Sequence, residues 1–304
     1  MSTEAGTRAD DFAVRRAMAE YYWGRGKGPA REYKHMDLEL NATVAVVTGG
    51  ASGIGLACGR RLAREGCHLA LWDLSNQVKD TAATLTKDFG VSSSGLAVDI
   101  SDFAAVESAL HETEVALGPV SHLVHAAAVG SGKFGFPFTN LKPDDWSHVL
   151  NVNVLGMVHV AHAIAPGMVS RKNGTMVYIA SVAGQIGSQT DPPYSASKAA
   201  NINFAQCLAK DLAPHGIRVN VVNPGMVRTP LNRRVWQAWN DRQLPDQQRS
   251  YEDWAGEKVR AVAPLGRWQE PDDVADMVAF LSSARAAQVT GQTINVDGGQ
   301  VMHW

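Results

Sequence analysis

Tyr194 and Lys198 are the first residues of this sequence whose types and spacing suggest chemistry, and they stand four positions apart in PPYSASKAA, residues 192–200. Four residues is just over one helical turn, so in a helix that begins near Tyr194 the lysine can reach the phenol. A phenol has a reference pKa of about 10, and a neighbouring ammonium group favours its ionised form. The pair could therefore act as a general acid and base, or it could be a solvated helix face; the spacing alone leaves both open.

The elements that must position this pair follow from the hydrophobic pattern. From residue 42 onward, short apolar runs alternate with longer helical patterns, which predicts βαβ units around a parallel sheet covered on both faces. We expect one α/β domain, a Rossmann-like doubly wound sheet of seven parallel strands. The predicted strands are 42–50, 67–73, 95–100, 122–129, 175–181, 218–225 and 292–299, and the predicted helices are 53–65, 76–89, 102–117, 143–171, 195–213 and 271–283.

Two segments interrupt this alternation. Residues 1–41 precede the first strand, and FAVRRAMAEYYW within them has apolar residues at helical spacing, which fits a docking arm or an upstream extension. We favour the extension. Residues 227–268 connect the sixth strand to the last helix, and connections of that length in a compact α/β domain are usually lids or binding segments. We therefore divide the chain into an extension or arm, 1–41, and a domain, 42–304, with a lid at 227–268.

Composition narrows the class of partner. The chain has 304 residues, a formal net charge of −2 and no run of Lys or Arg, so we expect a small-molecule substrate and no nucleic acid. We identify no apolar stretch long enough to predict a membrane span, and the first residues lack the apolar region of a secretory signal. The three cysteines lack metal-ligand spacing. We expect buried thiols, no metal and a cytoplasmic, reducing location.

A glycine-rich turn follows the first predicted strand. This turn, TGGASGIG, contains Gly49, Gly53 and Gly55. Each stands where a side chain would interfere: with a tight turn, with close approach of the backbone to a pyrophosphate, or with close packing of the helix on the sheet. The helix that follows presents free N–H groups and a positive dipole end to phosphates. With a strand before it and a helix after it, the turn predicts a dinucleotide site that includes Ser52 and Ile54.

An acidic residue indicates which dinucleotide binds. Asp73 ends the second predicted strand, where a carboxylate would accept hydrogen bonds from an adenosine ribose and repel a 2′-phosphate. The turn residues Gly50, Ala51 and Ser52 supply no cation for such a phosphate. We therefore expect NAD rather than NADP, with a turn or helix-cap role for Asp73 as the alternative. Asp99, after the third strand, either touches the adenine or caps the next helix.

With these motifs together, the chain resembles the short-chain dehydrogenase/reductases, specifically the type whose glycine motif is T-G-x-x-x-G-x-G. The resemblance covers residues 42–300. Ser181 stands thirteen residues before Tyr194, which is the serine-to-tyrosine spacing of that family, and NVNVLG places Asn153 at the position of the family's catalytic asparagine. The segment NPG, residues 223–225, followed by Thr229, and the ending TGQTINVDGG match as well.

The resemblance implies a role for each of four residues. Tyr194 would be the base in alcohol oxidation and the acid in carbonyl reduction, with Lys198 and an oxidised nicotinamide lowering its pKa. Ser181 would donate a hydrogen bond to the substrate oxygen, and Asn153 would help to hold a water against Lys198. Taken singly, these residues also fit structural roles. Ser181 could be a strand-end hydroxyl, Asn153 a helix residue that bonds its own backbone, and Lys198 a solvated charge.

The resemblance also implies further contacts to the nucleotide and one departure from the family. The nucleotide contacts are assigned to Asp99, Ile100, Ala126, Ala127, Tyr194, Lys198, Pro224, Gly225, Val227 and Thr229. Where the family usually has N-N-A-G after the fourth strand, this chain has HAAA, residues 125–128. Its small residues preserve close approach to the cofactor. His125 either replaces the missing asparagine as a hydrogen-bonding brace or is a histidine of the core.

The substrate is the least determined part of the prediction. Besides Ser181 and Tyr194, we assign Phe134, Gln185 and Trp236 to its pocket, although the lid tryptophans could equally pack in a core or against another subunit. The resemblance favours oxidation of a polyol, sugar or small hydroxy compound over reduction of a 3-oxoacyl thioester. A protein that binds NAD(H) as a signal without turnover is the rival class. The family also implies a homotetramer joined through the helices at 143–171 and 195–213.

Overall fold

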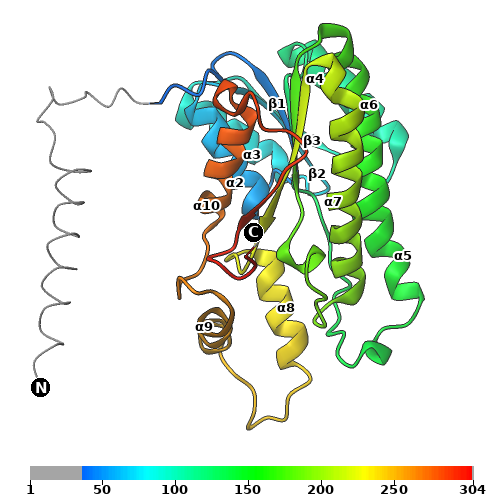
Figure 1. Ribbon diagram of the computed structural model, residues 1–304, viewed down its shortest axis with the longest axis vertical. Helices are drawn as coiled ribbons and strands as arrows, with labels where there is room; N and C mark the ends of the chain where they lie inside the picture. Colours follow the sequence, from blue (N-terminus) through cyan, green and yellow to red (C-terminus); the bar gives the residue numbers. More distant parts are fainter. Residues whose placement is uncertain (1–35, 303–304) are drawn as a thin grey trace, which may run out of the picture. The chain divides into compact units, whose positions relative to one another are not determined.

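The computed structural model describes residues 36–302 of the chain (Figure 1). Its sheet is parallel throughout and has seven strands in the order β3-β2-β1-β4-β5-β6-β7, which confirms the predicted fold class. The strands are β1 (Val44–Thr48), β2 (His68–Asp73), β3 (Ser93–Ala97), β4 (His122–His125), β5 (Gly174–Ile179), β6 (Ile217–Pro224) and β7 (Thr293–Val296). The chain order reverses between β1 and β4, and open α/β sheets bind ligands at the carboxyl ends of strands beside such a reversal.

Helices cover both faces of the sheet, as continuous apolar strands require. In Figure 1, α2, α3 and α10 lie on one face and α4, α6 and α7 on the other. The helices that cover the two faces are α2 (Gly53–Arg64), α3 (Val78–Phe89), α4 (Phe103–Leu117), α6 (Gly156–Arg171), α7 (Pro192–Leu212) and α10 (Pro271–Ser282). Strand β1 shows the alternation, because Ala45 and Val47 belong to the core cluster on the α2 side and Val46 to the cluster on the α4 side.

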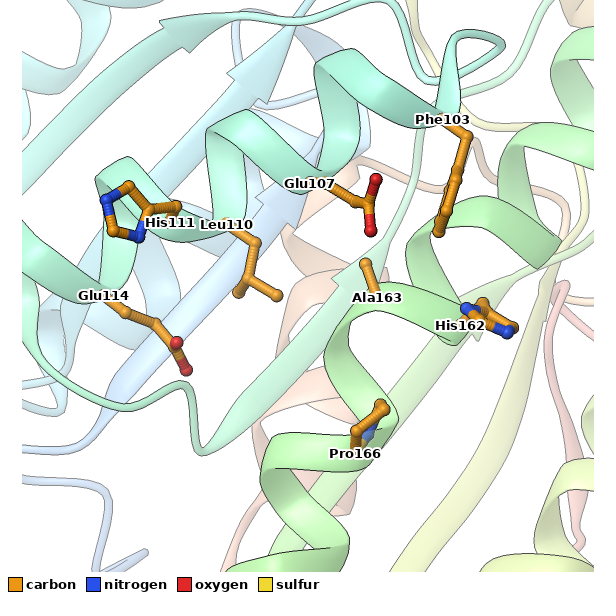
Figure 2. Close-up of a pocket in the computed structure, with 8 residues that line it drawn as sticks. All are labelled: Phe103, Glu107, Leu110, His111, Glu114, His162, Ala163 and Pro166. Atoms are coloured by element: carbon orange, nitrogen blue, oxygen red, sulfur yellow. The ribbon is translucent and has the colours of Figure 1, made fainter.

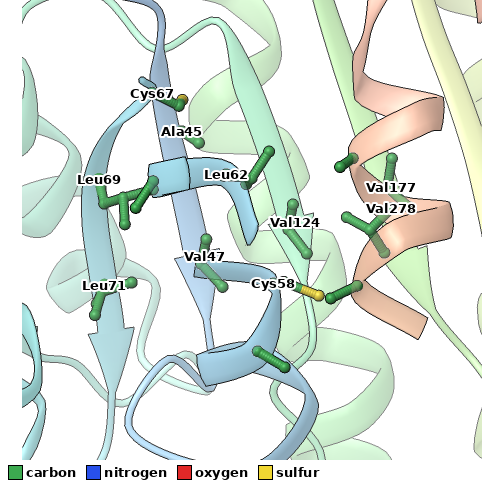
Figure 3. Close-up of a cluster of buried hydrophobic side chains, with 14 of the residues drawn as sticks. Ala45, Val47, Cys58, Leu62, Cys67, Leu69, Leu71, Val124, Val177 and Val278 are labelled. Carbon is green, nitrogen blue, oxygen red and sulfur yellow. The ribbon is translucent and has the colours of Figure 1, made fainter. Parts of the chain in front are cut away.

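Close packing on the α2 side holds the nucleotide-binding half of the sheet rigid. Figure 3 shows Leu62 of α2 and Leu69 and Leu71 of β2 within one cluster of apolar side chains, and all three are fully buried. Burying one such side chain contributes about 1.5–3 kcal/mol. Cys58 and Cys67 lie in the same cluster, as expected, and burial raises the pKa of the Cys67 thiol to about 11. The expectation of a buried thiol was wrong for Cys207, which is exposed on α7.

The long helix predicted at 143–171 is divided in the structure. It consists of α5 (Asp144–Leu150), one π-helical turn, η2 (Asn151–Leu155), and α6. Within the described residues this run is long and apolar enough to cross a membrane, with a mean hydropathy of 1.5 over its most apolar stretch. Core helices of α/β domains pass the same test, and Val160, Ile164 and Met168 pack in the core cluster on the α4 side. This run was not identified from the sequence because polar residues such as His159 and His162 interrupt it.

Helix α7 begins at Pro192, three residues before the predicted start. Pro192 and Pro193 occupy its first two positions, where a missing N–H is not needed for helical hydrogen bonds and the fixed φ suits the helix. Tyr194 therefore stands in the first turn and Lys198 one turn later. The expectation that a helix places both residues on one face is confirmed.

Residues 227–268 contain two helices that the hydrophobic pattern did not reveal. They are α8 (Pro230–Asn240) and α9 (Tyr251–Val262), and Figure 1 shows both beyond the carboxyl ends of the strands. Tyr251 and Trp254 of α9 form a small core of their own with aromatic residues from α8 and from the segment after α9. The two helices together therefore make up a compact unit, the aromatic lid, residues 227–268.

The division at residue 41 stays a prediction. The choice between a docking arm and an extension falls on residues 1–35, which lie outside the described part of the chain. Leu38 and Leu40, just before the first strand, are buried in the core cluster on the α2 side.

Candidate active site

Ser181 is placed by the loop that follows β5. Its Oγ accepts a hydrogen bond from the N–H of Ala183 at 3.1 Å, which leaves the hydroxyl hydrogen free to be donated elsewhere. That loop lies directly on α7, since a Cβ added at Gly184 would come within 2.7 Å of the Lys198 carbonyl carbon. Ser195 of α7 also bonds the Ala183 carbonyl and accepts from Ser188 N–H. The serine and the tyrosine predicted from sequence are therefore brought together.

Tyr194 is held mainly as the neutral phenol in the protein alone. Burial raises its pKa to about 12, a hydrogen bond from the Ser181 side chain lowers it, and the charge of Asp191 raises it. A hydroxyl that donates to the phenolate oxygen favours the ionised form. The expected lowering by Lys198 together with an oxidised nicotinamide stays a prediction, since it refers to the nucleotide-bound protein.

Lys198 lies beneath the same ring. Its side chain is 1% exposed, its Nζ is 5.5 Å from the centroid of the Tyr194 ring, and it donates to the carbonyl of Ile179 at 2.8 Å. Burial lowers the pKa of Lys198 to about 7. The solvated-charge reading of this lysine is therefore wrong. An ammonium group with a pKa near neutrality can gain or lose a proton at physiological pH.

Asn153 is bonded to neighbouring segments rather than to its own helix. It is fully buried in the π-turn, its Oδ1 accepts from Val129 N–H at 2.8 Å, and its Nδ2 donates to the Val129 carbonyl at 2.9 Å. The Nδ2 also donates to Ser197 Oγ at 2.9 Å, and Ser197 Oγ donates to the carbonyl of Tyr194 at 2.7 Å. A hydrogen-bonded path thus connects Asn153 to the first turn of α7. Ser197 was missed from sequence, and its only signal is its place between the tyrosine and the lysine.

His125 forms a brace, the first of the two roles left open for it. Its Nδ1 lies 3.1 Å from Thr48 Oγ1, and that oxygen accepts from the N–H groups of Ala126 and Ala127, each at 3.2 Å. Thr48 Oγ1 thus connects the His125 ring to the two backbone N–H groups that follow it. Burial lowers the pKa of His125 to about 3 and keeps it neutral. Thr48, the first residue of the glycine motif, ties the end of β1 to the loop after β4, a role that the motif alone did not indicate.

The glycine turn fits a dinucleotide phosphate. Gly49 has φ of +69°, and a Cβ there would lie 2.9 Å from Ala127 N; a Cβ at Gly55 would lie 2.1 Å from the Gly49 carbonyl oxygen. Helix α2 has no acidic residue in its first turn, and its N-cap, Ser52, makes no side-chain capping bond. The N–H groups at the helix start are therefore open to an anion. Ile54, the remaining residue predicted in this turn, is half-buried against the core on the α2 side.

Asp73 lies beside this turn and braces it. Its Oδ2 accepts from Ala51 N–H at 3.0 Å and its Oδ1 from Ser75 N–H at 2.9 Å. Each oxygen retains a further lone pair, so the turn role and a ribose contact are compatible. Asp99 is exposed, and hydrogen bonds from the Ser101 hydroxyl and N–H lower its pKa. Asp102 caps α4, so the capping role considered for Asp99 is wrong.

The other predicted nucleotide contacts lie at the carboxyl ends of the strands. Pro224 ends β6, Gly225 donates its N–H to the Val296 carbonyl at 3.1 Å, and Val227 bridges to Gln269. Thr229 caps α8 through a bond from Asn232 N–H, and its Cγ2 is 3.8 Å from a Cβ added at Gly53. The start of the aromatic lid therefore lies against the glycine turn. The buried Ile100 follows β3 and faces Gly156.

The predicted substrate residues are spread over three segments. Phe134 lies half-buried in the loop between β4 and α5. Gln185 lines a hollow of about 490 Å³ between residues 183–189 and the outer side of α7, and neither Ser181 nor Tyr194 lines it. Trp236 packs against Tyr251 at 5.7 Å and donates Nε1–H to the Arg249 carbonyl, so its ring belongs to the core of the aromatic lid. Their role in substrate binding stays a prediction.

A second hollow lies on the opposite side of α6 from α7. Figure 2 shows it between α4 and α6, and it holds none of the predicted site residues. It is lined by Phe103, Glu107, Leu110, His111, Glu114, His162, Ala163 and Pro166.

Comparison with known proteins agrees with this geometry. Residues 49–301 match the family model described as Enoyl-(Acyl carrier protein) reductase. A 3-oxoacyl-[acyl-carrier-protein] reductase of Thermotoga maritima is 31% identical over 265 residues, which cover 87% of this chain and 100% of the relative. The crystal structure of L-sorbose reductase from Gluconobacter frateurii with NADPH and L-sorbose superposes with a TM-score of 0.80 at 28% identity, over 88% of this chain and 100% of that one.

NAD⁺-bound xylitol dehydrogenase superposes with a TM-score of 0.79 at 28% identity, over 86% of this chain and 100% of that one. The matched region contains the glycine turn, the serine, the tyrosine and the lysine described above. The chain therefore belongs to the short-chain dehydrogenase/reductase family, the NAD(P)-dependent oxidoreductases that interconvert CH–OH groups and ketones.

Proposed function

We propose that the protein interconverts a secondary alcohol and a ketone at Tyr194, with NAD(H) as its cofactor. The observation that carries this proposal is that Ser181 and Lys198 both lie against Tyr194, in the first turn of α7. The pair provides a hydroxyl donor to the phenol oxygen and a buried amine 5.5 Å from the ring centroid. A surface Tyr-x-x-x-Lys pair would have neither.

Each residue has a defined part in the proposed reaction. In alcohol oxidation Tyr194 takes the hydroxyl proton, and in ketone reduction it returns that proton to the oxygen. Ser181 donates a hydrogen bond to the same oxygen as negative charge develops on it. Lys198 passes the proton onward from the tyrosine, since its pKa of about 7 lets it exchange protons near neutral pH. Asn153 fixes the backbone around Tyr194 through Ser197.

The nucleotide would be held by the glycine turn, Asp73 and the segment from Pro224 to Thr229. When bound, its nicotinamide takes the hydrogen and the electron pair of the alcohol C–H bond, or returns them to the ketone carbon. The open N–H groups at the start of α2 would bind the pyrophosphate.

We propose NAD rather than NADP because Asp73 presents a carboxylate beside the glycine turn. A 2′-phosphate there would face this negative charge, while a ribose diol would donate to it. Comparing initial rates with the two nucleotides at equal concentration tests the proposal, and a clear preference for NADP(H) would refute it.

For the substrate we propose a polyol, sugar or small hydroxy compound. The similarity to L-sorbose reductase and xylitol dehydrogenase over almost their whole length supports this class. A 3-oxoacyl thioester is the second candidate, because the Thermotoga maritima relative acts on 3-oxoacyl-[acyl-carrier-protein] and is slightly more similar in sequence.

A substrate panel separates these possibilities from the rival reading of a nucleotide sensor. The panel contains polyols, sugars, hydroxy acids and 3-oxoacyl thioesters, and the readout is the absorbance of the reduced nicotinamide. Turnover of one class identifies the substrate. Nucleotide binding without turnover of any class would favour the sensor.

We also propose a homotetramer joined through α5–α6 and α7, and a cytoplasmic location. Leu150 and Leu155 on the first of these helices are 36% and 48% exposed and provide apolar surface for a second subunit to cover. All three cysteines are free, which suits a reducing compartment. Light scattering that gives the mass of a monomer would refute the tetramer, and cell fractionation tests the location.

A further inference from the structure

Asp191 is a buried acidic residue directly before α7 that no predicted motif includes. It is 8% exposed, and its side chain does not cap the helix. Its Oδ2 instead accepts a hydrogen bond from the N–H of Ser131 at 2.8 Å, in the loop between β4 and α5. A Cβ at Gly130 would lie only 2.7 Å from that oxygen, so the loop approaches the carboxylate as closely as its backbone allows.

Further contacts join the same loop to the helix start. Gly135 donates its N–H to the Thr190 carbonyl at 2.8 Å, and a Cβ there would meet the Pro192 ring at 2.4 Å. At the other end of the loop, Val129 is held on both its N–H and its carbonyl by Asn153. The residues between Val129 and Gly135 are thus fixed to the segment that carries Tyr194, and Asp191 supplies the central bond.

The carboxylate is also a charge on the segment that carries the reacting phenol. Asp191 stands three residues before Tyr194, and its negative charge raises the pKa of that tyrosine. Burial raises the pKa of Asp191 itself, while hydrogen bonding from Ser131 favours its ionised form. A negative charge disfavours a second one nearby, so an ionised Asp191 keeps Tyr194 protonated.

Other charged groups surround this corner of the fold. On α7 itself Lys198 lies beneath the ring, and on α5 the carboxylate of Asp145 is paired with Lys133 of the loop at 2.7 Å. On the elements packed against α7, the remaining titratable side chains are Asp144 and His148 on α5, Arg218 on β6 and His215 on η4, and His125 of β4 interacts electrostatically with Lys198. Among acidic groups, only Asp191 contributes to the perturbation of Tyr194.

We propose that Asp191 is a positioning residue, which fixes the loop after β4 to the start of α7 through Ser131 and keeps Tyr194 in its proton-donating form by its buried negative charge. This inference rests on the proposed role of Tyr194 as acid and base. Its consequence is directional. Ketone reduction needs the protonated tyrosine, so in the wild type it would persist to higher pH than in a variant that lacks the charge. Alcohol oxidation needs the ionised tyrosine, so in the wild type it would begin only at a higher pH than in that variant.

Asp191→Asn separates the charge from the bond. The amide oxygen can still accept from Ser131 N–H, but the negative charge is lost. We expect the pH profiles of kcat/KM in both directions to move to lower pH by about one unit. Asp144→Asn, which removes an exposed carboxylate from α5, is the matched control and should leave both profiles in place. Profiles of Asp191→Asn that coincide with those of the wild type would overturn the electrostatic part of the proposal.

Asp191→Ala tests the bond. It removes the acceptor as well, so we expect the same shift in pH together with a several-fold rise in substrate KM, because the loop is released. An unchanged KM in a folded Asp191→Ala protein would overturn the positioning part.

A measurement without turnover separates this inference from the proposed function. The ring-carbon resonance of Tyr194 is followed with pH in protein labelled at tyrosine, and Tyr194→Phe identifies the signal. Ionisation at lower pH in Asp191→Asn than in the wild type supports the inference even if no substrate is turned over. Identical titrations overturn it even if the enzyme is active.

Discussion

At the scale of single residues, Tyr194 lies among groups that favour opposite protonation states. Burial and Asp191 raise its pKa, and the Ser181 hydroxyl lowers it. Lys198 lies beneath the ring in the protein interior, and this burial lowers the pKa of the lysine. The reactivity of the tyrosine is therefore set by its neighbours rather than by its own chemistry, and each neighbour can be tested by substitution.

Ser181→Ala removes the one hydroxyl that donates to the phenol and, in the proposed reaction, to the substrate oxygen. We expect kcat to fall about 10²- to 10³-fold, as for the loss of one donor to a developing oxyanion. Nucleotide affinity, measured by quenching of protein fluorescence, should change little. Ser188→Ala in the same loop is the control and should retain wild-type kcat. A Ser181→Ala enzyme with wild-type turnover would remove the serine from the mechanism.

At the scale of elements, the site depends on places where two backbones nearly touch. The glycine turn packs on the loop after β4 at Gly49, and the start of α2 packs on the turn at Gly55. Sequence predicted these glycines because each stands in a recognisable strand–turn–helix context. It did not predict the bracing role of Thr48, nor Ser197 or Asp191, because these roles arise from hydrogen bonds between segments far apart in the chain or from the start of α7, three residues before the predicted one.

Gly55→Ala should abolish nucleotide binding or folding, because the added Cβ would lie 2.1 Å from a backbone oxygen that has no room to move. Gly59→Ala, one turn later in the same helix, is the matched control. Its Cβ would meet only the ends of leucine side chains, which can shift, with Leu71 the nearest at 3.2 Å and Leu85 next at 3.5 Å. Thermal unfolding and NADH fluorescence titration measure the two effects. Equal tolerance of both substitutions would contradict the packing described for the turn.

Asp73→Asn tests the cofactor proposal at the edge of β2. The amide retains one acceptor for the turn and removes the charge that faces a 2′-phosphate, so the ratio of kcat/KM for NAD to that for NADP should fall by about tenfold or more. The change should come mainly from a gain with NADP. A ratio that stays constant would show that Asp73 serves the turn alone.

At the scale of the whole molecule, the fold class was predictable from the sequence and the two helices within the predicted lid segment were not. Seven apolar runs alternating with helical patterns predict a parallel sheet covered on both faces. The order of the strands was not predicted, because the handedness of the connections does not determine which strands are neighbours. The helices α8 and α9 escaped prediction because their buried faces are aromatic side chains that contact one another, such as Tyr251 and Trp254, rather than a regular aliphatic stripe against the sheet.

Two buried histidines predict how stability depends on pH. Burial lowers the pKa of His122 to about 4 and that of His125 to about 3, whereas in the unfolded chain both take up a proton near the reference value of 6.5. The unfolded state therefore binds more protons below that value. Their stabilising contribution is complete above about pH 6.5 and is lost as the pH falls towards 4, with each histidine contributing a slope of up to about 1.4 kcal/mol per pH unit.

Chemical denaturation at a series of pH values measures this slope. His125→Asn should reduce it, and replacement of the exposed His111 by Asn should leave it unchanged. A free energy of unfolding that is independent of pH between about 6.5 and 4 would contradict the neutral, buried state assigned to both rings.

The central claim is that Tyr194 exchanges a proton with the oxygen of a secondary alcohol or its ketone, while a nicotinamide exchanges a hydride with the carbon of the same substrate. The most direct test follows the absorbance of reduced nicotinamide over the substrate panel with the wild type and Tyr194→Phe side by side, after confirming that both bind NADH. We predict turnover of at least one class by the wild type and a loss of about 10²-fold or more in the variant. Equal turnover by the two proteins would contradict the claim.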